Sequence, residues 1–225
     1  MALILNIDTS METAGICLSL EGNALLHREH PEQKDHAAWL HNSIRDMLAE
    51  GGYRVADLQA VAVTAGPGSY TGLRVGMAAA KGLCYALKIP LITENSLTLL
   101  AFTVQGRAGE LRVPMICPMI DARRMEVFAA LYTKDLEEIL PASAMVLDEE
   151  SWAGYLDQQP ILFTGSGCRK WLALVHGDHI LYEEARSPGI SLAKLAEKKF
   201  NAAEFTDIVY SEPVYIKEFY THTKK

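Results

Sequence analysis

The stretch GPGSYTGLRVG, residues 66–76, joins the run Ala60–Ala65, which is apolar except for Thr64, to a helical pattern that ends near Leu87. An apolar run of this length is typical of a central strand that is covered on both faces of a sheet. The glycines and the proline favour a tight turn, and the N-terminus of the following helix offers free N–H groups to an anion. The Lys of a Walker A loop and the spacing G-x-G-x-x-G are both missing. The stretch therefore predicts a strand–loop–helix unit of an α/β fold, whose loop is either a structural turn or an anion-binding turn.

The helix after this loop has little charge, since Arg74 and Lys81 are the charged residues between Thr71 and Leu87. One apolar stripe can face a sheet and consists of Leu73, Met77, Ala80, Cys84 and Leu87. A second stripe of small or apolar residues consists of Gly72, Gly76, Ala79 and Leu83. Each glycine inside a helix costs about 0.5 to 1 kcal/mol relative to alanine, so close packing must recover that cost. Two interpretations stay open: a second helix of the chain covers the stripe, or a partner protein does.

The composition is that of an ordinary globular chain, with 225 residues of which 49% are apolar and 22% charged. This length allows one large domain or two small ones. Lys and Arg total 21 against 28 Asp and Glu, and the net charge of −7 argues against a chain that grips nucleic acid by itself. Four isolated cysteines and the lack of a signal-peptide core or a long apolar span predict a cytoplasmic protein in a reducing compartment.

The first half of the sequence predicts an antiparallel meander of three strands, then a helix, a strand, the helix described above, a short strand and a third helix. The expected ranges are 3–7, 14–20, 24–29, a helix capped by Asp35 and ended by Gly51-Gly52, 60–65, a helix to Leu87, 91–93, and a helix from Ser96 to Val104. The polar segment 107–112 is the expected junction. Two domains follow, 1–106 and 107–225, with the last segment able to pack back on the first.

The second half begins as the first does. Ile120-Asp121, a turn and a strand at 125–132 echo Ile7-Asp8, a turn and the strand 14–20, which predicts two structurally related halves. A strand at 113–120, a helix at 149–156, a strand at 161–164, the turn Gly165-Ser166-Gly167 and a helix at 191–200 complete the pattern.

Catalytic apparatus is sparse in this sequence. His36 and His41 are five residues apart and point to different faces of a helix, whereas ligands of one metal lie three or four apart. No H-E-x-x-H and no G-x-S-x-G motif occurs, and Ser69 has no base that the sequence identifies. We nominate no catalytic residue and no metal ligand, and we expect a chain that is not itself an enzyme.

Asp8 and Asp121 each end a strand just before a turn, where a carboxylate can hold a magnesium–phosphate unit through water. Together with the turn at Gly165 they resemble the nucleotide cleft of the actin-like superfamily of sugar kinases and Hsp70, in which two related halves close over ATP. Arg123 and Arg124 occupy the turn where that superfamily usually has glycine, so we expect no tightly bound cofactor, and ATP or ADP with Mg only weakly or with a partner's help. The candidate nucleotide or anion contacts are Asp8, Thr9, Ser10, Gly66, Gly68, Ser69, Asp121, Gly165 and Gly167.

Four segments, in order along essentially the whole chain, resemble the TsaB (YeaZ) family. They are ILNIDTS at 4–10, GPGSYTGLRVG at 66–76, IDARRMEVF at 120–128 and EPVYIK at 212–217. The resemblance implies a two-lobed actin-like (ASKHA, ribonuclease H-like) α/β fold, each lobe a mixed sheet flanked by helices. It also implies a non-catalytic scaffold for TsaD in making N6-threonylcarbamoyladenosine at adenosine 37 of tRNAs that read codons starting with A. The alternative is a nucleotide-dependent small-molecule kinase of the same superfamily.

The resemblance further implies which partners the chain meets. TsaD carries its metal in an H-x-x-x-H pair, which this sequence lacks. Some relatives carry an old protease label, but this sequence offers no metal cluster for such an activity. TsaD, or a second copy of the chain, would contact the first two helices, the ATPase TsaE would dock on the pair, and tRNA would land on the composite surface; no membrane is involved. The implied interface residues are Leu40, Ile44, Met47, Leu48, Gly72, Gly76, Met77, Ala79, Ala80 and Leu83.

Overall fold

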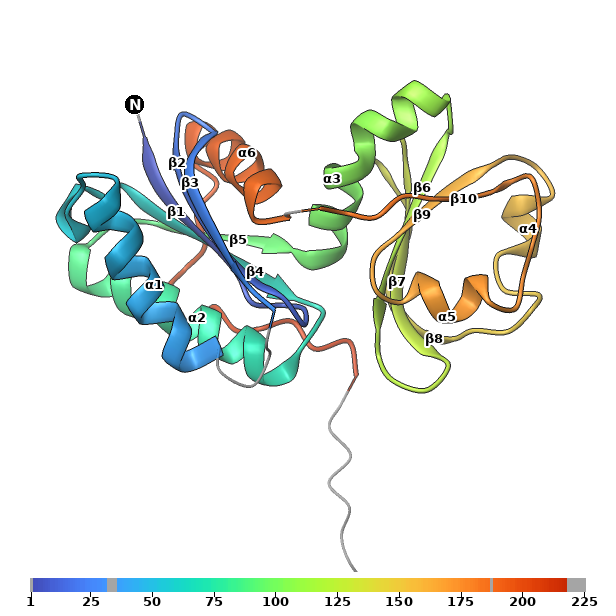
Figure 1. The fold of residues 1–225 in the computed structure, drawn as a ribbon, viewed down its shortest axis with the longest axis horizontal. Coiled ribbons are helices and arrows are strands. Elements are labelled where there is room, and N and C mark those ends of the chain that lie inside the picture. The colour runs from blue at the N-terminus through green and yellow to red at the C-terminus, as the bar shows by residue number, and fades with distance from the viewer. Residues whose placement is uncertain (1, 32–35, 187, 218–225) are drawn as a thin grey trace, which may run out of the picture.

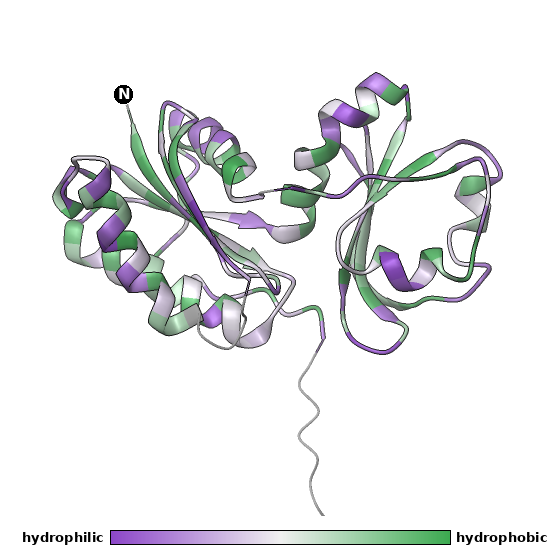
Figure 2. Cartoon of the chain, viewed as in Figure 1, coloured by the Kyte–Doolittle hydropathy of each residue, from purple (hydrophilic) through white to green (hydrophobic). Residues whose placement is uncertain are grey.

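The computed structural model describes residues 2–31, 36–186 and 188–217, which form two lobes, each built on a five-stranded sheet (Figure 1). The strand orders are β3-β2-β1-β4-β5 in the first sheet and β10-β9-β6-β7-β8 in the second. Apolar residues run along the central strands of both lobes (Figure 2). No helix in the described ranges combines the length and the apolarity that crossing a membrane requires.

The first lobe opens with the predicted antiparallel meander, which the structure confirms. Its strands are β1 (Leu3–Asp8), β2 (Ala14–Leu20) and β3 (Asn23–His30), and β1 also pairs in parallel with β4 (Ala60–Gly66), followed by β5 (Leu91–Asn95). Helices α1 (His36–Glu50) and α2 (Tyr70–Leu87) pack on this sheet, and a short 3₁₀ turn, η2 (Val55–Asp57), precedes β4. The predicted cap Asp35 lies outside the described residues.

The second lobe repeats the topology of the first, so the predicted relation between the halves is confirmed. Strand β6 (Met115–Asp121) pairs antiparallel with β7 (Glu126–Thr133) and parallel with β9 (Ile161–Thr164), as β1 does with β2 and β4. The outer strands β8 (Glu138–Val146) and β10 (Ile180–Tyr182) and the short helix α5 (Cys168–Leu172) were not predicted. The helix expected at 149–156 is only the single turn α4 (Ala153–Leu156).

Helix α3 (Ser96–Leu111) crosses the predicted domain junction. Asn95, rather than Ser96, caps it, because the Asn95 side chain accepts hydrogen bonds from the backbone N–H groups of Leu97 (2.8 Å) and Thr98 (3.3 Å). The helix continues past Val104 because Val104 and Ala108 pack into the apolar cluster of the second sheet. A boundary at residues 106 and 107 therefore falls inside a helix.

The chain returns to the first lobe at α6 (Pro188–Asn201). Leu192 and Ala196 of this helix are fully or almost fully buried against the face of the first sheet opposite α1 and α2, in one cluster with Ile4, Ala62 and Ile92. The two faces of the first sheet are thus covered by α1 and α2 on one side and by α6 on the other (Figure 1). The residues after α6 continue along the first lobe, so that this lobe is built from both ends of the described chain.

Candidate functional site

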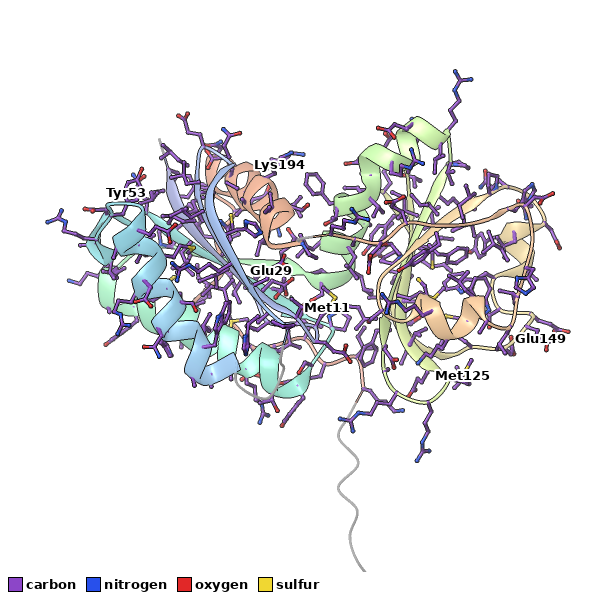
Figure 3. All side chains as sticks on the ribbon, in the orientation of Figure 1. Met11, Glu29, Tyr53, Met125, Glu149 and Lys194 are labelled. Carbon is purple, nitrogen blue, oxygen red and sulfur yellow. The ribbon has the colours of Figure 1, made fainter. Side chains whose placement is uncertain are left out.

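A cleft of about 290 Å³ lies between the two lobes, and of the nine nominated nucleotide contacts only Gly68 is among its described lining residues. The turn after β1 lies close to the second lobe, since Met11, labelled in Figure 3, packs against the apolar cluster that α3 shares with the second sheet. The cleft is lined by Pro67, Gly68 and Tyr70 of the first lobe, Ala122, Arg123 and Phe128 of the second, and the C-terminal residues 214–217.

Asp8 is buried, with 2% of its surface exposed, and its carboxylate is bound by the chain itself. One carboxylate oxygen, Oδ1, accepts hydrogen bonds from the Ser10 backbone N–H (3.1 Å), the Ser10 hydroxyl (2.7 Å) and the Thr64 hydroxyl (2.9 Å). Thr9 and Ser10 are also fully buried. The predicted magnesium–phosphate corner of the first lobe is therefore a packed hydrogen-bond network.

The glycine loop before α2 packs against other parts of the same chain. A Cβ on Gly68 would overlap the carbonyl oxygen of Ser10, and one on Gly66, at φ +118°, would overlap that of Val214. The Ser69 N–H donates to the Ser10 carbonyl (2.7 Å), and the Ser69 hydroxyl caps α2 by accepting from the N–H of Gly72 (3.3 Å). Contacts within the chain thus account for these glycines, as expected of the structural-turn interpretation.

The two glycines of the second α2 stripe, Gly72 and Gly76, are also covered by the chain, here by the turn after β1 rather than by a helix. A Cβ on Gly72 would overlap the Thr9 carbonyl oxygen, and one on Gly76 would overlap the Thr9 hydroxyl, which donates to the Gly72 carbonyl (2.7 Å). The turn after β1 thus fills the glycine part of the stripe, which neither interpretation had considered, while Ala79 and Leu83 pack with the core cluster that includes residues of α1. All the nominated interface residues except the half-buried Leu83 are buried within the chain, namely Leu40, Ile44, Met47, Leu48, Gly72, Gly76, Met77, Ala79 and Ala80.

The outward face of α2 consists of different residues, which the sequence analysis missed. Ala78, Gly82 and Ala86, at intervals of four, are exposed, and Tyr85 beside them is 80% exposed. A Cβ on Gly82 would meet no atom within 4 Å. The spacing of small residues at 78, 82 and 86 is the signal that identifies this face. We call this set, together with the exposed Ala37, Ala38, His41, Asn42 and Arg45 of α1, the outer helical face.

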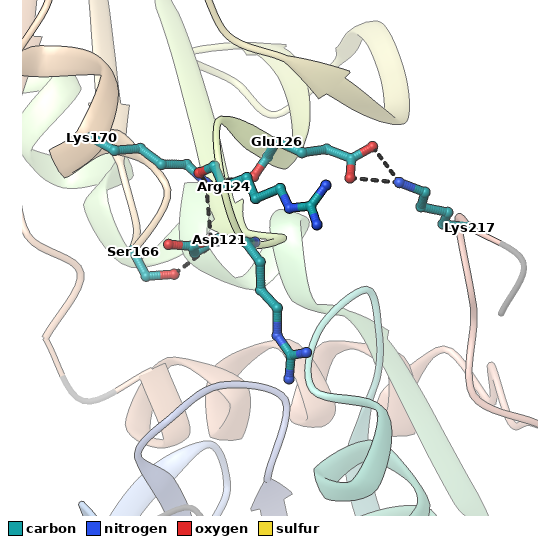
Figure 4. Close-up of polar contacts among 7 residues, drawn as sticks. Asp121, Arg124, Glu126, Ser166, Lys170 and Lys217 are labelled. Carbon is teal, nitrogen blue, oxygen red and sulfur yellow. Dashed lines mark hydrogen bonds and ion pairs between the residues drawn. The ribbon is translucent and has the colours of Figure 1, made fainter. Parts of the chain in front are cut away.

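In the second lobe, the turn from Asp121 to Glu126 is held by one lysine (Figure 4). The Lys170 ammonium, on a side chain that is 17% exposed, donates to Asp121 Oδ1 (2.9 Å) and to the carbonyls of Arg124 (2.8 Å) and Glu126. The Ser166 hydroxyl accepts from the Asp121 backbone N–H (3.1 Å). Unlike Asp8, Asp121 is exposed, and its oxygen Oδ1 serves the turn by accepting from Lys170 and from a backbone N–H.

Gly165 and Gly167 support β6 rather than facing the cleft openly. A Cβ on Gly165, at φ +97°, would overlap the carbonyl oxygen of Met119, and the Gly167 N–H donates to that same carbonyl (2.9 Å). A Cβ on Gly167 would also lie 2.7 Å from Val127 Cγ1. Gly165 and Gly167, predicted as nucleotide or anion contacts, are therefore part of the packing beneath the turn.

The C-terminal segment 206–217, which we call the strap, links the lobes. It begins with an antiparallel bridge between Thr206 and Leu91 of β5, and the Val214 N–H donates to the Ala65 carbonyl (2.7 Å) at the end of β4. It ends with an ion pair between Lys217 and Glu126 of β7 (2.6 Å). The strap therefore crosses the mouth of the cleft from one lobe to the other.

The cysteines of the described chain are free and buried. Burial raises the pKa of the Cys17 thiol to about 12 and that of Cys84 to about 11, and it raises those of Cys117 and Cys168 as well. A thiol with a raised pKa is a poor nucleophile at neutral pH. Among the described residues, no three His, Cys, Asp or Glu side chains are grouped to hold a metal ion.

Comparisons with known proteins give a consistent result. Residues 29–153 match the family model described as TsaD, tRNA N6-adenosine threonylcarbamoyltransferase. The chain is 34% identical over 167 residues to the tRNA threonylcarbamoyladenosine biosynthesis protein TsaB of Bacillus subtilis, covering 72% of this chain and 70% of that protein. It is 29% identical to TsaB of Escherichia coli, covering 95% and 94%. The solved structure of YeaZ from Pseudomonas aeruginosa matches with a TM-score of 0.78 and 28% identity, covering 96% of this chain and 100% of that one.

Proposed function

The chain belongs to the TsaB (YeaZ) family and acts in tRNA threonylcarbamoyladenosine biosynthesis, and we propose that it does so as a non-catalytic subunit bound to a TsaD-type transferase. The transferase would act on adenosine 37 of tRNAs that read codons starting with A. The family names favour this role over the kinase alternative. The match of a transferase family model to residues 29–153, which include α1 and α2, supports a partner with a related lobe.

The outer helical face is the observation that supports a partner most directly. Gly82 costs α2 about 1 kcal/mol relative to alanine, and no contact within the described chain recovers that cost. Small residues at positions 78, 82 and 86 allow a second helix to approach closely, and Tyr85 offers a large exposed ring next to them. We assign this face to the transferase, or to a second copy of the chain when the transferase is absent, at roughly 800 Å² per partner.

The residues first nominated for the interface support this face from beneath. Leu40, Ile44 and Met47 of α1 and Met77 and Ala79 of α2 belong to one core cluster, which fixes the two helices relative to the sheet. Core packing of this kind presents a helix pair as a rigid surface. A rigid helix pair lowers the entropy cost of association.

A non-catalytic role fits the contacts at the cleft. Asp8 is held by hydrogen bonds within the chain, and the strap lines the cleft with residues 214–217. We propose that the chain holds no tightly bound cofactor, and that ATP or ADP with Mg binds weakly or only with a partner present. The ATPase TsaE and the tRNA would then join the pair of TsaB-type and TsaD-type subunits.

The test places the same bulky cation at two exposed helical glycines. Gly82→Arg lies on the outer helical face, whereas Gly106→Arg lies on α3, where a Cβ also meets no atom within 4 Å. We expect Gly82→Arg to abolish co-elution with the transferase and tRNA modification, while Gly106→Arg retains both and both variants keep the thermal stability of the wild type or exceed it. Co-elution of Gly82→Arg at wild-type affinity would refute the proposed interface.

A further inference from the structure

Two arginines stand at the mouth of the inter-lobe cleft with their charges unpaired. Arg123 and Arg124 are both exposed, and neither has an acidic partner within ion-pair distance among the residues that the structure describes. Arg123 lines the cleft. Two acids flank them in the turn, and both are already paired: Asp121 with Lys170 (2.9 Å), and Glu126 with Lys217 of the strap through both carboxylate oxygens (2.8 and 2.6 Å). These two lysines thus neutralise the acids of the turn and leave the two guanidinium groups free.

The turn that carries these arginines is both strained and rigid. Arg123 has φ +72° and Arg124 has φ +51°, in the left-handed region that favours Asn and Gly. Lys170 fixes the turn from beneath by three hydrogen bonds, as Figure 4 shows. Unfavourable backbone conformations that the surrounding structure enforces are concentrated at functional sites. The turn therefore holds the backbone of the two arginines in a fixed position, although Asn or Gly would adopt this backbone conformation more easily.

Aromatic rings accompany the cations across the cleft. Tyr70, Phe128 and Tyr215 all line it, and the ring centroids of Tyr70 and Tyr215 are 5.1 Å apart. The Arg74 guanidinium lies 3.9 Å from the Tyr70 ring centroid and donates to the Tyr215 hydroxyl (3.0 Å). Guanidinium groups next to exposed rings form the surface that binds single-stranded RNA, because phosphates meet the cations and unstacked bases stack on the rings.

We propose that this cleft mouth is an RNA contact, in which Arg123 and Arg124 bind phosphates and one unstacked base stacks on Tyr215, which is exposed beside the half-buried Tyr70 and Phe128. The inference rests on the proposed function, since the RNA is the tRNA that the complex modifies. Because the chain carries a net charge of −7, it can attract RNA phosphates only at this local group of cations. The transferase must then supply the further phosphate contacts. A free nucleotide shares the same chemistry of phosphate and base, so the experiment includes both ligands.

The experiment uses the complex of the chain with its TsaD-type transferase and two probes, a fluorescent unmodified tRNA transcript that reads codons starting with A, and a fluorescent ATP analogue. Variant R123E/R124E reverses the two charges. Variant R123N/R124G removes them and places residues that accept left-handed backbone, so the turn is preserved. The control, K134E/K194E, reverses the charges of two exposed lysines on the turn after β7 and on α6.

We expect R123E/R124E to weaken tRNA binding about tenfold or more and to lower the slope of log affinity against log salt by about 1.5, because two phosphate contacts are lost. R123N/R124G should weaken binding in the same direction without a loss of thermal stability, and K134E/K194E should match the wild type. Unchanged tRNA affinity and slope in both arginine variants overturn the inference, as does loss of the ATP analogue with unchanged tRNA binding. A wild-type chain that fails to co-elute with the transferase overturns the proposed function, whereas a normal complex that binds tRNA independently of both arginines overturns this inference alone.

Discussion

Alanine substitution at three glycines of one helix, α2, is expected to change stability in opposite directions. Gly82→Ala should stabilise the chain, whereas Gly72→Ala and Gly76→Ala should destabilise it. All three changes raise helix propensity by about 1 kcal/mol, so the difference between them reports only what surrounds each Cβ. The comparison therefore tests whether the glycine stripe packs inside the chain.

The magnitudes follow from the neighbours of each added Cβ. At Gly82 no atom lies within 4 Å, so the gain in propensity of about 1 kcal/mol is kept. At Gly76 the Cβ would overlap the Thr9 hydroxyl and lie 3.4 Å from Val63 Cγ2 and 3.5 Å from Ile7 Cγ2. Overpacking costs about 1–3 kcal/mol, and displacing the buried Thr9 hydroxyl from the Gly72 carbonyl costs about 1–3 kcal/mol more. The net loss at Gly76 is about 1–5 kcal/mol after the propensity gain.

Thermal and urea unfolding of the full-length chain, followed by circular dichroism, measures these changes. For a chain of this size we expect the melting temperature to rise by about 2–4 °C in Gly82→Ala and to fall by at least about 2 °C in Gly76→Ala. If Gly72→Ala and Gly76→Ala are as stable as the wild type or more so, the packing of α2 on the turn after β1 is wrong, and the stripe is free to meet a partner after all.

Three further predictions concern buried polar groups. Lys170→Met should lower the free energy of unfolding in urea by about 2–3 kcal/mol, because it removes the ammonium that binds Asp121 and two carbonyls. Asp8→Ala should lower it by a similar amount, about 2–3 kcal/mol, by leaving buried donors without their acceptor. Burial raises the pKa values of Cys17 and Cys84 to about 12 and about 11 from the ordinary thiol value of 9.0, so the unfolded chain loses its thiol protons first. The contribution of these thiols to stability should therefore be fully present below pH 9 and decrease as the pH rises toward 11. Urea titrations of Cys17→Ala/Cys84→Ala should show a shallower decrease in the free energy of unfolding over this pH range.

The sequence pattern predicts the first lobe well because its signals are local. Strands β1 to β4 and helix α2 follow from alternation, apolar runs and glycine punctuation that lie within each segment. The second lobe is predicted less well, since β8 is largely exposed and contains Pro141, while β10 has only three residues. Short or half-exposed edge strands lack a strong periodic signal.

The apolar stripe of α2 predicted to face the sheet is confirmed, since Leu73, Met77, Ala80 and Cys84 are buried. What covers the two glycines of the second stripe could not be predicted from the residues of α2. That role belongs to Thr9, more than sixty residues away in the sequence, whose carbonyl and hydroxyl fit against Gly72 and Gly76. In α3, similarly, Gly106 and Gly109 suggest a linker, but the contacts of Val104 and Ala108 with the second lobe extend the helix.

The duplicated topology allows the two corresponding turns to be compared directly. The turn after β1 is sealed, since Thr9 and Ser10 are fully buried and their carbonyls pack on the glycine loop and on α2. The turn after β6 is exposed, carries two cations in left-handed conformations and is held open by Lys170. A backbone N–H or C=O group that is already hydrogen-bonded within the fold is not available to a ligand. A turn whose polar atoms are all bonded within the chain therefore has few groups with which to bind one. On the two proposals made above, the halves divide the work: the helix pair of the first lobe binds a protein partner, and the cationic turn of the second lobe binds RNA.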